Sequence, residues 1–168
     1  MNVSGLLPVL AMLACTGVSR STPPPPQVAS NAPPDRPIFA TDTSRSDSLQ
    51  RLLQPCSARA RETYPEAKRR YLHGLPVGQS FFVTIALRDN DGRVEEVFVV
   101  VDEIKDGSIR GRIWNDIHIV HGFHNGQPLV VPEGSVRDWT ITHPDGTEEG
   151  NFRGKAVDQL QAGRMPVC

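Results

Sequence analysis

The stretch FFVTIALRDNDGRVEEVFVVV, residues 81–101, decides the fold class that the sequence predicts. Residues 81–87 are rich in β-branched and aromatic side chains, which favour strands. Residues 89–92, Asp-Asn-Asp-Gly, form a turn signal, and a second apolar run follows over residues 94–102. This order predicts an antiparallel hairpin. The second run is apolar at every position from 97 to 101, which indicates a strand buried on both faces or covered by a helix.

Further turn signals follow the hairpin at nearly regular intervals. They are Asp106-Gly107, Asn125-Gly126 and Pro144-Asp145-Gly146. Such spacing is typical of an antiparallel meander. The segments around these turns are predicted to be strand-like, over residues 108–114, 116–124, 129–131, 136–142 and 149–157.

A first helix is predicted before the hairpin. Leucines recur at helical spacing over residues 46–53, and Ser46 or Asp47 is a suitable N-cap. Pro55 is expected to end this helix, because proline has no N–H and clashes with the preceding turn.

A second helix is expected from Ser57 to Leu72, with Gly74 as its C-terminal cap. Pro65 predicts a kink or a restart at Tyr64. Acidic and basic residues interleave along this segment, and Glu66 with Arg70 has the favourable i,i+4 spacing. The pattern indicates a solvated helix face, with contact to anionic lipid headgroups or a partner as the alternative.

These elements predict an α+β fold. N-terminal helices would pack on a curved, mostly antiparallel sheet of five to six strands that could close part-way into a barrel. The length suits one domain, which we place at residues 47–168.

The first 14 residues are predicted to be a signal peptide. Residues 6–14 are apolar and uncharged, and they are too few to span a bilayer. Met12-Leu13-Ala14-Cys15 resembles the lipobox of bacterial lipoproteins, so Cys15 is expected to carry the lipid. The alternatives are ordinary secretion or a short buried helix. The resemblance implies a palmitate-type anchor in the outer membrane, facing the periplasm, because Thr16 is not Asp.

A proline-rich segment follows Cys15. Residues 15–46 contain four consecutive prolines at 23–26, with further prolines at 33, 34 and 37. Too few apolar side chains lie there to offset the entropy of ordering. We interpret the segment as a disordered, semi-rigid spacer between lipid and domain.

Lipid on Cys15 leaves an even pair of cysteines. Cys56 and Cys168 are then predicted to form a disulfide in an oxidising compartment, the alternative being two free thiols. The net charge is −1, with 18 basic and 19 acidic residues, so no nucleic-acid partner is expected. The expected partners are the membrane, through the anchor, and a protein.

Several short motifs together resemble the YegJ-like domain of unknown function. The resemblance covers about residues 58–160, and Glu96 to Val99 lacks the tryptophan that the family tends to carry there. It implies a fold and an exported location, and no activity. The matching residues are Ala60-Arg61, Thr63, Pro65, Gly78, Phe81 to Val83, Gly111 to Asn115, Gly126 to Pro132, Val136 to Trp139, Asp145-Gly146 and Gly150.

Four residues of these motifs are candidates for contact with a ligand or partner: Trp114, Asn115, Asp138 and Trp139. Packing in the core, with the indole N–H satisfied, is the ordinary role of a tryptophan in a strand. Asp138 is suited to accept a hydrogen bond from a neighbouring turn amide.

Three histidines form the one cluster with metal-ligand chemistry, His118, His121 and His124. Alternation along a strand would separate His121 from the other two, whereas a loop could bring all three together, with Asp116 as a further ligand. We expect polar loop histidines, and a metal site is the alternative. No cofactor is expected, and no serine-hydrolase, zinc-protease or phosphate-loop motif occurs. The carboxylate pairs at 95–96 and 148–149 should point to opposite faces of their strands.

The sequence therefore predicts a non-catalytic, lipid-anchored envelope module that binds a ligand or partner. An immunity-type inhibitor of a periplasmic toxin is one specific form of this hypothesis. A small envelope hydrolase that uses the histidine loop is the alternative.

Overall fold

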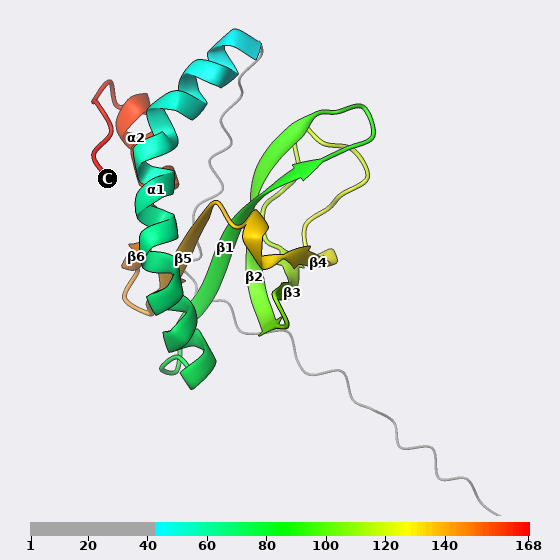
Figure 1. Ribbon diagram of the computed structural model, residues 1–168, viewed down its shortest axis with the longest axis vertical. Coiled ribbons are helices and arrows are strands. Elements are labelled where there is room, and N and C mark those ends of the chain that lie inside the picture. Colours follow the sequence, from blue (N-terminus) through cyan, green and yellow to red (C-terminus); the bar gives the residue numbers. More distant parts are fainter. Residues whose placement is uncertain (1–42) are drawn as a thin grey trace, which may run out of the picture.

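The hairpin predicted around residues 89–92 lies near the centre of an antiparallel sheet (Figure 1). The computed structural model describes residues 43–168, with side chains from 47 onward, so the predicted signal peptide, Cys15 and most of the predicted spacer lie outside the described residues. Within residues 43–168 the sheet has six strands in the order β4-β3-β2-β1-β5-β6. The strands are β1 (Ser80–Arg88), β2 (Val94–Lys105), β3 (Ser108–Ile113), β4 (Pro128–Pro132), β5 (Asp138–Thr142) and β6 (Glu148–Gly150).

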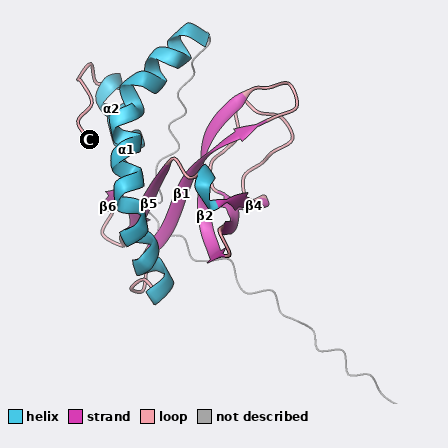
Figure 2. Ribbon diagram, viewed as in Figure 1, coloured by secondary structure: helices cyan, strands magenta, loops and turns pink. Residues whose placement is uncertain are grey.

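The predicted α+β class is confirmed. Two α-helices accompany the sheet in the described part, α1 (Thr43–His73) and α2 (Phe152–Gln161), and a short 3-10 helix, η1 (Glu133–Ser135), joins β4 to β5. Figure 2 shows α1 lying across one face of the curved sheet, which does not close into a barrel. Neither described α-helix is long and apolar enough to cross a membrane.

The two predicted N-terminal helices are one continuous helix, so the expected end at Pro55 is wrong and the helix does not restart at Tyr64. The helix also begins at Thr43, within the predicted spacer. Its buried residues explain the continuity, because Cys56, Ala60 and Ala67 are at most 2% exposed. Packing of this face outweighs the hydrogen bonds that the prolines remove. The ribbon of α1 changes direction in its N-terminal part (Figure 1).

One predicted strand is absent and another is mostly helical. Residues 116–124 form a loop, and the segment predicted as a strand over 149–157 leaves β6 after Gly150 and becomes α2. Gly150 and Asn151 both have positive φ, 70° and 52°, which reverses the chain there. A Cβ atom on Gly150 would lie 2.2 Å from the carbonyl oxygen of Trp139, so glycine is required.

One core fills the space between α1 and the sheet. Odd-numbered residues of β1 and β2 face the helix, among them Phe81, Val83 and Val99. Tyr71 of α1 stacks on Phe81 with the ring centroids 5.2 Å apart. A second, smaller cluster joins α1 to α2 through Leu53, Cys56, Ala156 and Val157.

The charged face of α1 differs in detail from the prediction. Glu66 pairs with Arg69 at i,i+3 instead of with Arg70. Arg70 instead binds the carboxylate of Glu149 through two hydrogen bonds of 2.6 and 2.8 Å. Arg70 therefore pairs with a residue of β6 and not with a residue of its own helix.

Candidate functional site

Trp139 belongs to the core and not to the surface. It is 5% exposed, and its ring meets Phe152 of α2 edge-on. The indole N–H donates to Thr63 Oγ1 of α1 at 3.0 Å. The residue therefore has the ordinary role expected of a tryptophan in a strand, and it is not available to a ligand.

Trp114 and Asn115 lie directly after β3. Trp114 is half-buried, with its ring centroid 6.0 Å from that of Phe82. Asn115 is 7% exposed, and its Oδ1 accepts a hydrogen bond from the N–H of Phe98. Of the four candidate contact residues, Trp114 alone keeps a partly exposed side chain in the described part of the chain.

Asp138 is 1% exposed and holds α2 in place. Its Oδ1 accepts the N–H of Trp139 at 2.8 Å, and its Oδ2 accepts the N–H of Arg153, in the first turn of α2, at 2.6 Å. The donors are thus a strand amide and a helix amide in place of the turn amide that was predicted. Burial raises the pKa of Asp138 to about 7, against the lowering effect of these two N–H groups and of Arg153.

Arg153 joins three elements through a buried guanidinium. Two of its nitrogens, Nε and Nη2, donate to Glu96 of β2 at 3.1 and 2.6 Å. Nη1 donates to Ser57 at 2.6 Å and Nη2 to Gln50 at 3.1 Å, both on α1. Arg137 also donates to Glu96, at 2.5 Å. The side chain of Arg153 is 6% exposed, so this network is part of the architecture.

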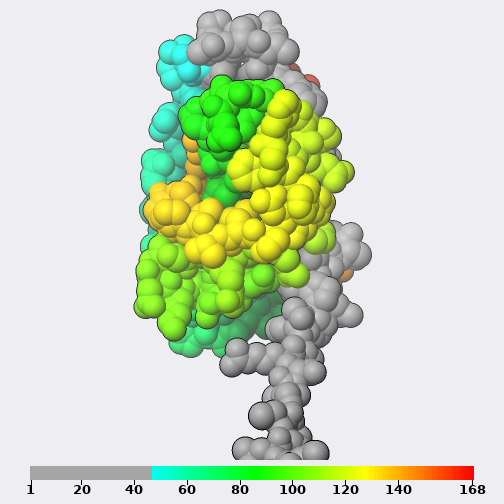
Figure 3. All heavy atoms as spheres, turned by 90° about the vertical axis from the view of Figure 1, so that its right-hand side faces the viewer, coloured from blue at the N-terminus to red at the C-terminus, as the bar shows by residue number. Residues whose placement is uncertain are grey.

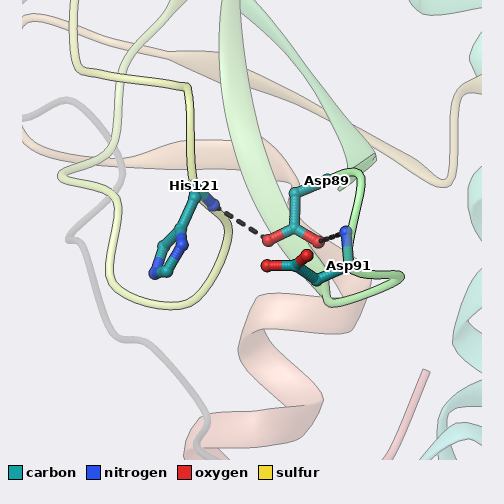
Figure 4. Close-up of side chains that lie close together, drawn as sticks. All are labelled: Asp89, Asp91 and His121. Atoms are coloured by element: carbon teal, nitrogen blue, oxygen red, sulfur yellow. Dashed lines mark hydrogen bonds between the residues drawn. The ribbon is translucent and has the colours of Figure 1, made fainter.

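The three histidines do not converge on one point. His121 instead lies near Asp89 and Asp91 of the β1–β2 turn, and their ligand atoms are within 4.8 Å of one another (Figure 4). The guanidinium of Arg93 already binds this group, because it donates to both aspartates and lies 2.7 Å from His121 Nδ1. An arginine of the same chain thus supplies the positive charge that a metal ion would bring.

Asp89 connects this turn to the histidine loop. Its carboxylate accepts the N–H groups of Asp91, Arg93 and His121 at 2.9–3.0 Å, and its side chain is 3% exposed. Burial opposes ionisation of Asp89, but the hydrogen bonds from His121 and Arg93 outweigh it and lower its pKa to about 2.

Glu95 holds the same loop from the adjacent strand. This buried carboxylate accepts three consecutive backbone N–H groups, those of His118, Ile119 and Val120, at 3.0, 2.8 and 3.0 Å. Loop residues 116–124 were predicted as a strand because their pattern resembles one. Their amides bind carboxylates in place of a neighbouring strand, which the local sequence does not reveal.

A small cavity lies between α1 and the segment that follows β4. Its volume is about 140 Å³. Figure 3 views the molecule from this side and shows η1 (orange) against α1 (cyan to green). The cavity is lined by Ala60, Arg61, Tyr64, Glu133, Gly134, Val136, Arg137 and Asp138.

Two basic residues, Arg61 and Arg137, and two acidic residues, Glu133 and Asp138, line this cavity. Glu133 is neutralised by Lys68 through bonds of 2.6 and 2.8 Å. Arg61 is exposed and forms no ion pair with any residue from 47 to 168. Burial raises the pKa of Tyr64, and nearby Glu133 raises it further. The hydroxyl of Tyr64 is buried, and within the described residues it makes no hydrogen bond of normal geometry.

No family model, curated protein or solved structure matches this chain. The resemblance to YegJ-like domains therefore stays a prediction. Function has to be inferred from the chain's own residues.

Sequence reasoning missed the residues that organise the region around the cavity. The sequence predicts a strand at Arg153, and it predicts that Glu95 and Glu96 point to opposite faces of theirs. They do point to opposite faces, as predicted, and each binds a different segment. One signal was present in the sequence, since two adjacent carboxylates in an otherwise apolar strand require partners when the strand is buried.

Proposed function

We propose that this chain is a non-catalytic binding module of the bacterial cell envelope, anchored by lipid on Cys15 and directed at a protein. The size of the cavity carries the proposal. Sites for small-molecule ligands usually have volumes of about 300–1,000 Å³, whereas this cavity has about 140 Å³. It has room for one side chain of a partner.

The Cys56–Cys168 disulfide supports an exported location. The predicted pair is bonded, with 4.9 Å between the Cα atoms, and Cys56 is fully buried. Structural disulfides persist in oxidising compartments such as the periplasm. This agrees with the predicted signal peptide and with an anchor in the outer membrane.

The exposed guanidinium of Arg61 at the cavity favours an acidic partner. Glu96 binds both Arg137 and Arg153, and Arg61 adds a further exposed cation. One carboxylate from a partner could bind Arg61 while an apolar neighbour fills the cavity. A toxin blocked by an immunity-type lipoprotein is one partner of this kind.

A partner could also bind by adding a strand to the sheet, but the sequence of β4 opposes this. Hydrogen bonds from Ile113 to Gln127 and from Glu133 to Gly107 fix the pairing of β4 with β3. In this pairing the backbone N–H and C=O positions of Pro128, Val130 and Pro132 face the free edge of the sheet. Two of these three residues lack an N–H, so the edge offers one donor to an added strand.

The anchor is tested by Cys15→Ser in the bacterial host. We expect the variant to leave the membrane fraction and to lose labelling by a palmitate analogue. A variant that stays membrane-bound would contradict the anchor.

The partner surface is tested by comparing Arg61→Glu with Arg59→Glu, which reverses an exposed charge that pairs with Glu62 on the same helix. Proteins crosslinked to the full chain in intact cells should be lost with the first variant and kept with the second. Equal loss, or loss with neither variant, would contradict the assignment of this surface.

The hydrolase alternative has a separate test. Stoichiometric zinc in the purified protein, lost on His118→Ala and His121→Ala substitution, would favour it. The proposed binding module should contain no zinc at stoichiometric level.

A further inference from the structure

The cavity beside α1 is bordered by small residues that leave room for a guest. Ala60 of α1 and Gly134 of η1 both line it, and a Cβ atom added to Gly134 would meet no heavy atom within 4 Å. Tyr64 and Val136 form more of the wall, so its surface is mainly apolar. An apolar cavity of about 150 Å³ is large enough to bind benzene, and this cavity has about 140 Å³. One aromatic side chain of a partner would therefore fill it.

Of the two arginines that line the cavity, only Arg61 is available to a partner. The guanidinium of Arg137 donates to Glu96 at 2.5 Å. Arg61 is exposed and pairs with no residue from 47 to 168. The acidic residue Glu133 does not compete for it, because Lys68 binds both of its oxygens. A carboxylate that binds Arg61 would thus lie beside an apolar cavity.

The carboxylate and the ring have to come from nearly the same point of the partner, because Arg61 itself lines the cavity. In an extended peptide, the side chain of an adjacent acidic residue points to the opposite face from the ring. The next side chain on the same face lies about 7 Å further along the chain. The last residue of a protein has no such constraint, because its backbone carboxylate is attached to the Cα atom that carries its side chain. One terminal residue can therefore supply both groups.

We propose that the cavity and Arg61 bind the C-terminal residue of a partner protein, one with an aromatic side chain and a free carboxylate. This inference rests on the proposed partner surface and specifies which part of the partner it binds. A guanidinium suits this role, because it can donate two parallel hydrogen bonds to one carboxylate. Capture of a free C-terminal carboxylate is a recurring mode of peptide recognition. Because one residue carries the interaction, proteins that share this last residue would bind alike.

Short peptides test the proposal with the purified full chain, through the amide NMR signals of Ala60 and Gly134. Gly-Gly-Gly-Phe with a free carboxylate should shift these signals on titration. Its C-terminal amide should bind about tenfold more weakly, because it has lost the charged acceptor. Gly-Gly-Gly-Ala with a free carboxylate should also lose about tenfold or more, because it leaves the cavity empty.

A blocked peptide tests the alternative of an internal acidic residue. Acetyl-Gly-Phe-Glu-Gly-amide carries a ring and a side-chain carboxylate without a free chain end, and it should bind no better than the amide of Gly-Gly-Gly-Phe. Equal affinities for the free acid and its amide, tighter binding of the blocked peptide, or no binding by any of these peptides would overturn the proposal.

Arg61→Gln should abolish the preference for the free acid over the amide. Arg59→Gln is the matched control, because Arg59 is an exposed arginine of the same helix that pairs with Glu62. This variant should keep the preference. A preference that survives Arg61→Gln would show that another group binds the carboxylate and would contradict the assignment.

Gly134→Leu adds a side chain to the cavity wall at a position with open space around it. It should weaken binding of Gly-Gly-Gly-Phe several-fold and leave the thermal unfolding of the protein nearly unchanged. Ser135→Leu is the control, because Ser135 is the exposed neighbour that does not line the cavity. Unchanged peptide affinity in Gly134→Leu would contradict the cavity as the site of the ring.

Crosslinking in cells separates this inference from the partner surface on which it rests. Crosslinks lost with Arg61→Glu alone, together with equal binding of the acid and amide peptides, would leave the partner surface standing and overturn recognition of a chain end. Crosslinks lost with Arg61→Glu alone, together with a preference for the free acid, would support both.

Discussion

At the scale of single residues, buried carboxylates organise this domain. The side chains of Asp138 and Glu95 accept hydrogen bonds from backbone N–H groups in place of water, and most of these donors belong to other segments. Removing one partner of a buried hydrogen bond is costly, because the group that is left cannot bind water instead. Each of these residues therefore has a specific, measurable effect on stability.

Asp138 should make stability depend on pH. Its pKa is about 7 in the folded protein, above its ordinary value of 3.8, so the folded state binds more protons than the unfolded state between these values. Unfolding free energy should therefore fall as pH rises from about 4 to 7, by up to about 4 kcal/mol from this residue.

Asp138→Asn cannot titrate, so its unfolding free energy should fall less steeply in this window. Urea unfolding at several pH values measures the difference. A constant difference between the two proteins from pH 4 to 7 would show that Asp138 does not titrate there.

Glu95→Gln should loosen the histidine loop. Glutamine has one acceptor oxygen where the carboxylate has two, and its NH₂ group would face a backbone donor. We expect a loss of about 1–3 kcal/mol in unfolding free energy. Amide hydrogen exchange should become faster at residues 118–120, whose N–H groups bind Glu95.

Glu103→Gln is the matched control on the same strand. Its side chain is 45% exposed and pairs with Arg110. Exposed pairs contribute little, so the change should stay within about 0.5 kcal/mol. Similar effects at positions 95 and 103 would contradict the role given to Glu95.

At the scale of elements, α2 is held by charge and by small apolar side chains. Arg153 binds β2 and α1, while Ala156 and Val157 pack against Leu53 and Cys56. The helix has ten residues, which is too short for independent stability in water. Its position therefore depends on these tertiary contacts.

Arg153→Met should destabilise the domain by about 2–4 kcal/mol, because Glu96, Ser57 and Gln50 lose a shared donor in a buried setting. Urea unfolding checks the loss. The double variant Arg153→Met with Glu96→Gln should lose less unfolding free energy than the sum of the losses in the two single variants. Arg69→Met removes an exposed pair of the same type on α1 and should be nearly neutral. Additive effects of the two changes at 96 and 153 would contradict the coupling.

At the scale of the whole molecule, the disulfide links the end of the chain to the middle of α1. The bond joins Cys56 to Cys168 across 112 residues. Chain-entropy estimates for a loop of this length give about 4–5 kcal/mol, which is an upper value.

The double change Cys56→Ala and Cys168→Ala should therefore lower the unfolding free energy by up to that amount. Reducing agent should destabilise the natural chain by a similar amount and leave the double variant unchanged. Thermal unfolding with and without reductant measures both effects. Equal sensitivity of the two proteins to reductant would contradict a structural role for the bond.

Local signals in the sequence determined the central part of the fold. The apolar run at 97–101, the turn at 89–92 and the glycine turns predicted β1 to β3 correctly, because strand alternation and turn geometry depend on neighbours in the chain. The number of cysteines predicted the disulfide, because two remain to pair in an oxidising compartment once Cys15 is assigned to the lipid. The class of fold followed from these elements.

Only the tertiary structure decided the rest. Helix α1 continues through two prolines because its buried face packs on the sheet, and α2 exists because Asp138 and Glu96, distant in sequence, bind Arg153. The histidine loop likewise takes its shape from Asp89 and Glu95. These interactions join residues far apart in the chain, and a local pattern does not contain their free energy. The same reason keeps Trp139 in the core and leaves Trp114 half-buried after β3.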